Sequence, residues 1–410
     1  MPTLDYTEKL TGIKAEWIQN FKDTASALIV SVQLPPKEHT CPKCKSTTKR
    51  IKGYYTRLIK HSPLLHKELR LMYRQRRYKC SCGHTFNEKS PFASRHFQTS
   101  SLLRQSILHE LRQHCSYKEI ARRCHVSTNQ VIRVFDEVHI SRPRNLPYVL
   151  AIDEFKGNAA GQKYQVIITD PKKKRILDIL PARATPALIQ YFRQFPAHER
   201  RKVAFITMDM SLQFRAVMKL LFPKARIVVD RFHLFRLVQW AMERVRKAEQ
   251  KTLCQHSRLF KSNKRILSKH HEDLTEQELI KLEGILHHSQ RLKHAYGLKF
   301  TFSRVLLFKD DVNISWAISS WLNLVKSANL PEMNSLSKTF TYWYEEIKNA
   351  LLYPYSNGFT EGCNNKIKVL KRVSFGLRNF ERFRKRILYI NACNEKGHAP
   401  DSVRVPSRSA

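Results

Sequence analysis

The sequence predicts a multidomain α/β protein in which a mixed-sheet core contains a helical insertion and follows two smaller modules. Three observations predict this architecture. Two closely spaced cysteine pairs occur near the N-terminus, strand and helix patterns alternate over residues 148–233, and helical periodicity then dominates up to about residue 350. At 410 residues the chain is long enough for two to four domains.

The charge balance predicts a polyanionic partner. The chain contains 74 Lys and Arg residues against 34 Asp and Glu residues, a formal net charge of +40. The basic residues occur along the whole chain, which favours an extended nucleic-acid track. No apolar run approaches the roughly 18 residues needed to span a bilayer, and the N-terminus lacks a signal-peptide pattern. We therefore expect a cytoplasmic protein without a membrane partner.

The first module, residues 1–95, contains the spaced pairs Cys41-x-x-Cys44 and Cys80-x-Cys82. Such pairs can bring four thiolates to one tetrahedral Zn²⁺ ion, and four thiolates leave no open position for water. We expect a structural zinc site. The alternative is four unrelated buried cysteines, against which the polar and basic flanking residues argue.

The second cysteine pair is one residue shorter than the usual spacing, so His84 is an alternative ligand. Gly83 suits the tight turn that a metal knuckle requires. Residues before the second pair read as β-type over 68–78, whereas residues 1–40 read as a short helical or mixed lead-in. We expect Arg76 and Arg77, beside the zinc site, to face DNA phosphates.

The second module, residues 96–145, contains helix-turn-helix spacing over residues 116–134. Ile120 and Ala121 would pack the first helix, and Val131 and Ile132 the second. Ser127 would cap the second helix. His125 occupies a turn position where glycine is commoner.

The outward side chains of the second helix are of the kinds that contact base edges or phosphates. They are Thr128, Asn129, Gln130 and Arg133. The alternative is an ordinary helical hairpin without a DNA-binding role.

The core begins after a proline-containing break near residue 145. Its strand candidates are 148–155, 163–169, 175–180, 203–209 and 226–230, and its helix candidates are 185–195 and 212–222. This order predicts an α/β layer with a mixed sheet. We expect the domains 146–239 (core, first part), 240–350 (helical insertion), 351–396 (core, second part) and 397–410 (disordered tail).

Three carboxylates stand out in this basic chain. Asp153 and Asp209 each end an apolar run, and Glu361 follows the turn signal Ser356-Asn357-Gly358 at the start of a basic helix. Acids from strand ends and a helix start can converge on two Mg²⁺ or Mn²⁺ ions, the arrangement that phosphodiester chemistry uses. For Asp153 alone, a strand-end turn residue is an equally good interpretation.

Four motifs then resemble the signature of bacterial insertion-sequence transposases. They are IDEF from Ile152, MDM from Met208, FPKARIVVDRFH from Phe222, and SNGFTEGCNNKIKVLKRVSFGLRNF from Ser356. With the cysteine pairs and the helix-turn-helix, the chain resembles the ISL-three family from end to end. The resemblance implies an RNase H-like core with a DDE triad and a helical insertion before the glutamate. The implied triad is Asp153, Asp209 and Glu361.

The family further implies a transposase that binds terminal inverted repeats, then cleaves and joins DNA strands with two Mg²⁺ ions. A homodimer or larger synaptic complex and a nucleoid-associated location follow from that reaction. One alternative is a catalytically inactive DNA-binding regulator built from the same modules. Another is an RNase H-like nuclease without strand transfer.

Neighbouring polar residues complete the expected site. Asp230 competes with Asp209 for the second position, and His233 would orient a carboxylate or the substrate. Glu154 points to the opposite strand face from Asp153. Active-site support is expected from Asn357 and Asn365. Basic residues after Glu361 would line the DNA path: Lys366, Lys368, Lys371, Arg372, Arg378, Arg382, Arg384, Lys385 and Arg386.

Overall fold

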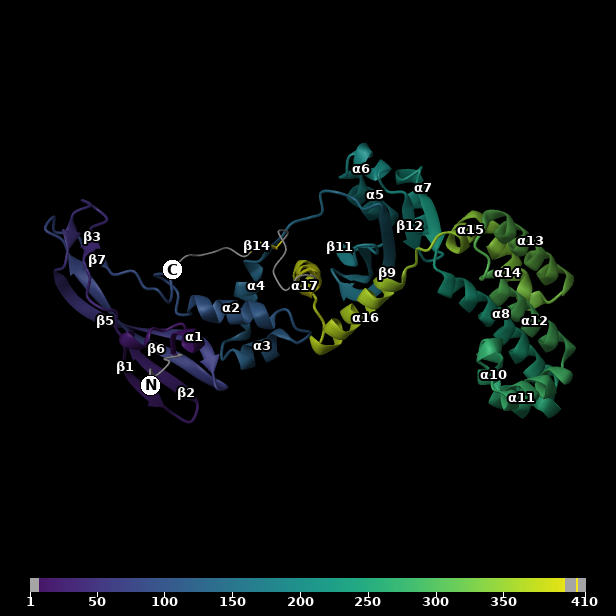
Figure 1. Ribbon diagram of the computed structural model, residues 1–410, viewed down its shortest axis with the longest axis horizontal. Coiled ribbons are helices and arrows are strands. Elements are labelled where there is room, and N and C mark those ends of the chain that lie inside the picture. The colour runs from purple at the N-terminus through teal and green to yellow at the C-terminus, as the bar shows by residue number, and fades with distance from the viewer. Residues whose placement is uncertain (1–6, 395–402, 405–410) are drawn as a thin grey trace, which may run out of the picture. The chain divides into compact units, whose positions relative to one another are not determined.

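The chain divides into two compact units. The computed structural model describes residues 7–394 and 403–404 (Figure 1). The first unit combines residues 1–142 with residues 366–410, and the second contains residues 143–365. Each unit is described by itself.

The first unit begins with a five-stranded sheet of order β1-β2-β6-β5, with β7 paired to β6. Its strands are β1 (Ile18–Asp23), β2 (Ala27–Val32), β5 (Ile51–Leu64), β6 (Lys67–Lys79) and β7 (Thr85–Asn87). The β-type prediction over 68–78 is confirmed. Of the two expectations for the lead-in, the mixed one holds, since it contains α1 (Thr7–Thr11) and η1 (Ala15–Trp17) as well as β1 and β2. Apolar side chains of β2 and β6, such as Val30 and Leu71, form the core of this sheet.

Helices follow in the same unit. α2 (Ser101–Glu110), α3 (Tyr117–Arg123) and α4 (Thr128–Asp136) form the predicted helical region. Val131, Val134 and Phe135 of α4 are buried, whereas Ile132, expected in the core, is half-buried.

The C-terminal helix α17 (Phe380–Asn394) packs against this helical core. The Tyr389 ring lies 5.8 Å from that of Phe135. This differs from the expectation that residues 351–396 belong wholly to the catalytic core. Of the predicted disordered tail, residues 397–402 and 405–410 lie outside the described residues. Val403–Arg404 form β14, which pairs with β8 (His139–Ile140).

The second unit is built on a five-stranded mixed sheet of order β11-β10-β9-β12-β13. Its strands are β9 (Val149–Ala159), β10 (Gln162–Asp170), β11 (Arg175–Leu180), β12 (Phe205–Met208) and β13 (Arg226–Val229). β9, β10 and β11 are antiparallel, whereas β12 is parallel to both β9 and β13. The predicted mixed α/β layer is therefore confirmed. The helices between the strands are α5 (Thr185–Arg193), α6 (Ala197–Arg201) and α7 (Leu212–Leu221).

A long helical segment follows β13. It begins with α8 (Arg231–Thr252) and continues with η2 (Cys254–His256), α9 (Ser257–Ser262), α10 (Lys264–Ser268), η3 (His271–Asp273), α11 (Glu276–His287), α12 (Gln290–Val305), α13 (Asp311–Ser327), α14 (Pro331–Tyr342) and α15 (Tyr344–Leu352). The expected break near 272–276 lies between η3 and α11, and Ser289 caps α12. α16 (Gly358–Val373) then begins in the second unit and ends in the first.

Candidate active site and DNA-binding modules

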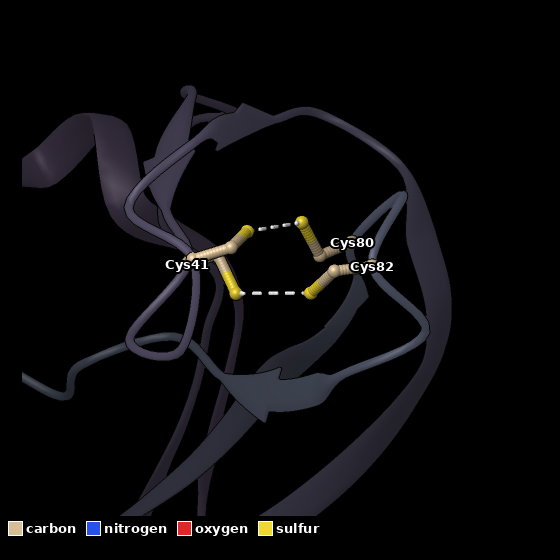
Figure 2. Close-up of side chains that lie close together, drawn as sticks. Cys41, Cys80 and Cys82 are labelled. Carbon is tan, nitrogen blue, oxygen red and sulfur yellow. Dashed lines mark hydrogen bonds between the residues drawn. The ribbon is translucent and has the colours of Figure 1, made fainter.

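Four cysteines converge at the open end of the β5–β6 hairpin, where the chain enters β5 and leaves β6. The Sγ atoms of Cys41, Cys44, Cys80 and Cys82 all lie within 4.8 Å of one another. Figure 2 shows Cys80 and Cys82 on one loop facing Cys41 on the other. Two loop residues adopt positive φ, Lys45 at 64° and Gly83 at 83°, so the predicted tight turn at Gly83 is present.

The spacing of these thiols fits zinc. The Cys41–Cys82 Sγ distance is 3.8 Å and the Cys44–Cys80 distance is 3.4 Å, close to the edge of about 3.8 Å of a tetrahedron with Zn–S bonds of about 2.3 Å. The Ser46 hydroxyl lies 2.9 Å from Cys44 Sγ and 3.2 Å from Cys80 Sγ. It lowers the pKa of both thiols, which favours the thiolate form that binds metal. His84 is not needed to complete the set.

Of the two arginines expected beside the zinc site, Arg77 is exposed, whereas Arg76 is buried. Arg76 Nη1 lies 3.4 Å from the buried Glu88 carboxylate. The prediction that Arg76 faces phosphates is therefore wrong, because its guanidinium is buried beside the Glu88 carboxylate.

The helix-turn-helix has the predicted local geometry. The Ser127 hydroxyl accepts a hydrogen bond from the Gln130 N–H and caps α4. His125, in the turn, has φ 52°, the left-handed conformation that explains why glycine is commoner there. Thr128, Asn129 and Arg133 are exposed, and Gln130 is half-buried.

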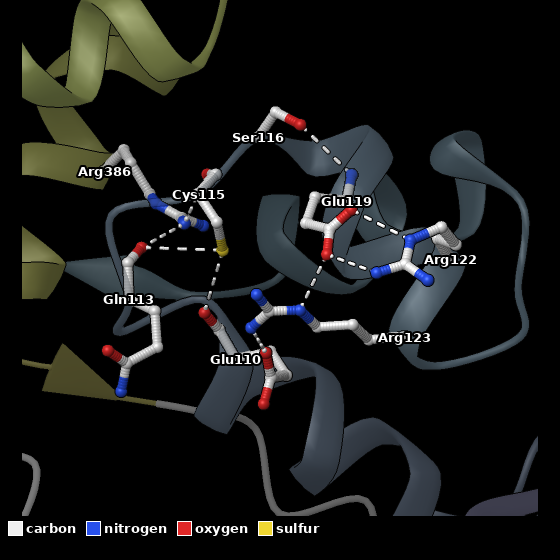
Figure 3. A network of polar contacts seen from close by, with 8 residues as sticks. All are labelled: Glu110, Gln113, Cys115, Ser116, Glu119, Arg122, Arg123 and Arg386. Carbon is white, nitrogen blue, oxygen red and sulfur yellow. Dashed lines mark hydrogen bonds and ion pairs between the residues drawn. The ribbon is translucent and has the colours of Figure 1, made fainter. Parts of the chain in front are cut away.

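A polar network fixes α3 against its neighbours, as Figure 3 shows. The Ser116 hydroxyl caps α3, and the Glu119 carboxylate accepts from Arg122 and Arg123. Arg386 of α17 donates to the backbone oxygens of Gln113, at 2.9 Å, and Cys115, at 3.3 Å.

The basic residues after Glu361 divide into exposed and buried positions. Lys366, Lys368, Arg372 and Arg378 are exposed, and Lys371, Arg382 and Lys385 are half-buried. Arg384 and Arg386 are buried, so the expectation that they line a DNA path is wrong.

Three acids of the second unit occupy equivalent positions on three neighbouring strands. In the parallel ladder Met208 of β12 pairs with Ile152 of β9 and with Val229 of β13. Asp153, Asp209 and Asp230 are the next residues in each case. Asp153 does not end its strand as expected, since β9 continues to Ala159, but it follows the last residue of β9 that pairs with β12. All three acids therefore lie at the carboxyl edge of the parallel part of the sheet, where α/β folds bind ligands.

Asp153 is oriented by two hydrogen bonds. Its Oδ1 accepts from the Glu154 N–H at 2.7 Å, and its Oδ2 accepts from the Asn364 side chain at 2.8 Å. Asn364 is buried in the first half of α16, whereas Asn365, the predicted support residue, is exposed. Sequence reasoning chose Asn365 from helical spacing and missed Asn364. Glu154 pairs with Arg183 at 2.7 Å, away from the site.

Asp209 and Asp230 flank His233. The His233 Nδ1 atom lies 3.1 Å from Asp209 Oδ1 and 3.7 Å from Asp230 Oδ1. Asp230 caps α8, and its oxygens accept from the N–H groups of Phe232, at 2.8 Å, and Asn357, at 3.0 Å. Asn357, a predicted support residue, is fully buried and contributes this backbone contact.

Glu361 enters the site from the first turn of α16. The start of this helix is fastened to the sheet, because the Thr360 hydroxyl lies 2.9 Å from that of Thr169 in β10. Ligand atoms of Glu361, Asp230 and His233 all lie within 4.8 Å of one another, so these three residues could hold a cation.

The carboxylates disfavour one another's charge. Burial, with the charges of Asp209 and Glu361, raises the pKa of Asp153 to about 7. Burial also raises the pKa of Asp209 and of Glu361. Burial alone would raise the pKa of Asp230, but hydrogen bonds from His233 and from two backbone N–H groups lower it. A divalent cation would relieve this repulsion, and oxygen donors are the ligands that Mg²⁺ prefers.

Among the described residues, no helix combines the length and apolarity that crossing a bilayer requires.

Comparisons with known proteins identify all three modules. A family model for ISL3 transposases, described as "Transposase", matches residues 150–387. The "Helix-turn-helix domain of transposase family ISL3" matches residues 88–139. The "zinc-finger of transposase IS204/IS1001/IS1096/IS1165" matches residues 37–83.

The chain is also similar to curated proteins. The transposase for insertion sequence element IS1001 of Bordetella parapertussis is 23% identical over 382 residues, which cover 91% of this chain and 93% of that protein. The transposase for IS1557 of Mycobacterium tuberculosis is 24% identical over 270 residues, covering 59% and 60%. A Lactococcus lactis protein named ATP-dependent protease matches 28% of this chain at 35% identity, covering 35% of that protein, which is too short a match to carry its name across. Because one family model spans more than half of the sequence, the chain belongs to the ISL3 family of insertion-sequence transposases, DNA-binding enzymes with a DDE domain.

Proposed function

We propose that this transposase cuts and joins DNA with Asp153, Asp209 and Glu361 as its metal-binding triad, on a sheet of the RNase H-like type. The observation that carries the proposal is the alignment of the two aspartates. Both follow a pair of residues that are in register on adjacent parallel strands. Adjacent strands lie about 4.8 Å apart, close enough for two carboxylates to share metal ions, whereas Asp230 is one strand further from Asp153.

Hydrogen bonding also favours Asp209 over Asp230 as the second acid. The Asp209 side chain is 34% exposed, and its Oδ1 faces His233 Nδ1 at 3.1 Å. Asp230 is buried, and both of its oxygens accept from backbone N–H groups. Asp230 also lies close to His233 and Glu361. Because Asp230 caps α8 and contacts His233, we assign it the role of positioning the His233 imidazole, which leaves Asp209 as the second acid.

Each residue then has a distinct task. Asn364 holds one Asp153 oxygen and so fixes the orientation of the carboxylate. His233 orients Asp209. Burial alone would lower the pKa of His233, but the nearby Asp230 and Asp209 carboxylates outweigh burial and raise that pKa. Two Mg²⁺ ions, when bound, would activate the attacking oxygen and stabilise the leaving oxygen of an in-line displacement. Water would attack for cleavage and a freed 3′-hydroxyl for strand transfer, so no covalent protein–DNA link is needed.

The other modules would bring DNA to this site. We propose that the exposed first-turn residues of α4 contact the terminal inverted repeats and that the zinc site stabilises the module before it. Lys368, Lys371, Arg372 and Arg378 would contact DNA phosphates. Pairing two element ends requires a homodimer or a larger synaptic complex. The domain boundaries expected from the sequence remain part of the proposal, except that residues from Lys366 onward belong to the first unit.

The triad is tested by the variants Asp153→Asn, Asp209→Asn and Glu361→Gln in a Mg²⁺-dependent cleavage assay on the element's own ends. Each variant should lose about 10³-fold or more in rate, because metal ions contribute several kcal/mol to such reactions. Glu154→Gln is the matched control, since this neighbouring acid pairs with Arg183 outside the site. Near-normal cleavage by any triad variant would remove that residue from the triad.

The two alternative functions are tested with wild-type protein. A pre-cut end with a free 3′-hydroxyl should be joined to target DNA. Cleavage without joining would identify a nuclease, and tight DNA binding without either activity would identify a regulator.

A further inference from the structure

A continuous groove runs along one face of the zinc-containing module. It consists of two adjoining cavities of about 1140 Å³ and 710 Å³. Tyr55, Arg57, Asn87 and Arg95 line both cavities, which makes them one groove. We call it the ribbon groove. One end lies at the zinc loops, at Pro42 and His84, and the other at Ser127 and Gln130 of the helix-turn-helix.

The ribbon groove is positively charged. Lys52, Arg77, Lys89 and Arg95 line it, are exposed, and form no ion pair within the described part of the chain. The only acidic residue among those lining the two cavities is Glu88, which is 3% exposed and lies 3.4 Å from the guanidinium of Arg76. Burial raises the pKa of the Tyr55 hydroxyl, although the positive charges of Arg57, Arg95 and Arg77 act to lower it. The groove therefore offers net positive charge to a ligand.

The floor of the groove is fixed before any ligand binds. Arg57 donates to the backbone oxygens of Ser94, at 3.0 Å, and Phe97, at 2.8 Å. Tyr55 donates to the buried Gln75 side chain, which in turn donates to the backbone oxygen of Glu88. A pre-organised surface of this kind loses little side-chain entropy on binding.

The groove is joined to α4 by direct contacts. Lys60 Nζ donates to the His125 backbone oxygen at 3.1 Å, and His125 Nε2 lies 3.0 Å from the His66 oxygen. Ser127 and Gln130, at the start of α4, line the groove's end. The N-terminus of a helix carries partial positive charge and favours phosphate, so the positive surface continues to the end of the proposed recognition helix.

We propose that the ribbon groove binds the phosphodiester backbone of the same DNA duplex whose bases α4 contacts. The zinc-containing module would then act as a second DNA contact, rigidly spaced from the helix-turn-helix. This inference rests on the proposed recognition role of α4. A duplex is favoured over a single strand because the groove leads directly to a helix of the kind that enters the major groove.

The test is the salt dependence of DNA binding by the full-length, zinc-loaded protein without Mg²⁺, so that failure of the catalytic proposal does not affect it. The probes are a duplex of the DNA that borders this gene and a single strand of the same length. The variants are Lys52→Gln, Arg77→Gln, Lys89→Gln and Arg95→Gln, singly and combined. Each lost phosphate contact should reduce the slope of log K against log[salt] by about 0.9 for duplex DNA.

Lys22→Gln is the matched control. Lys22 is an exposed lysine on β1, at the opposite edge of the same sheet. Its substitution should leave the slope of log K against log[salt] unchanged. Zinc content and thermal unfolding should match wild type in every variant. A wild-type slope in the combined variant would overturn the proposal, as would a slope change seen only with the single strand. If Arg133→Gln of α4 left duplex binding unchanged while the groove variants weakened it, the link to α4 would be lost.

Discussion

At the residue scale, the orientation of the Asp153 carboxylate depends on the side-chain amide of Asn364. Asn364 donates to Asp153 from a buried position, while its neighbour Asn365 is exposed. We expect Asn364→Ala to reduce Mg²⁺-dependent cleavage by about 10–100-fold and to raise the Mg²⁺ concentration needed for half-maximal rate, because groups that orient metal ligands contribute on that scale. Asn365→Ala, the matched control, should have a smaller effect. A Mg²⁺ titration of cleavage by both variants measures this, and equal losses would contradict it.

The triad residues could be proposed from sequence because each ends or begins a recognisable pattern. Asn364 could not, because Asn364 and Asn365 both lie about one turn from Glu361. Arg76 shows a related limit. Leu69, Leu71 and Tyr73 face the core, so strand alternation would bury Arg77. Arg76 is buried instead, beside Glu88, which reaches it only after the chain turns back.

At the element scale, the turn before α4 stores backbone strain. His125 has φ 52°, and a residue with a Cβ atom pays about 1–2 kcal/mol in that conformation. His125→Ala should therefore be less stable than His125→Gly by about 1 kcal/mol, although both lose the contact with His66. Urea unfolding followed by circular dichroism measures the difference. An alanine variant as stable as the glycine variant would show that the turn relaxes.

A buried lysine gives the insertion a pH-dependent stability. Lys299 of α12 donates to the Leu267 backbone oxygen at 2.8 Å, near the end of α10, and burial lowers its pKa from 10.5 to about 8. Between these values the unfolded chain binds the proton more tightly, so stability should rise with pH, by at most about 3 kcal/mol. Lys299→Met should remove this rise, whereas Lys293→Met, an exposed lysine on the same helix, should not. Thermal melts of the three proteins from pH 7.5 to about pH 10 test this.

Most elements were predictable because their signals are local. The strands of the second unit follow apolar runs, and Ser127 marks the start of α4. The packing of α17 against the helix-turn-helix could not be predicted, because it depends on contacts between residues far apart in sequence, such as Phe135 and Tyr389. The charge run on α17 predicted a DNA path, but Arg386 instead binds backbone oxygens of Gln113 and Cys115.

At the scale of the whole molecule, the C-terminal residues return to the N-terminal unit, so the chain passes through the second unit between two parts of the first. α16 contributes Glu361 to the second unit and ends in the first. A single helix therefore connects the candidate catalytic site to the unit that contains the zinc and helix-turn-helix modules. This connection follows from chain topology and could not be read from any local motif.

The division into two compact units predicts two thermal transitions. Zinc would stabilise only the unit that contains the cysteine cluster, because a metal that binds the native state lowers the free energy of that state alone. Chelation of zinc, or the substitution Cys80→Ser, should lower the temperature of one calorimetric transition and leave that of the other unchanged. Metal analysis should show the loss of zinc. Cys254→Ser, at an exposed cysteine of the other unit, should change neither. A shift of both transitions on chelation would show that the two units unfold as one.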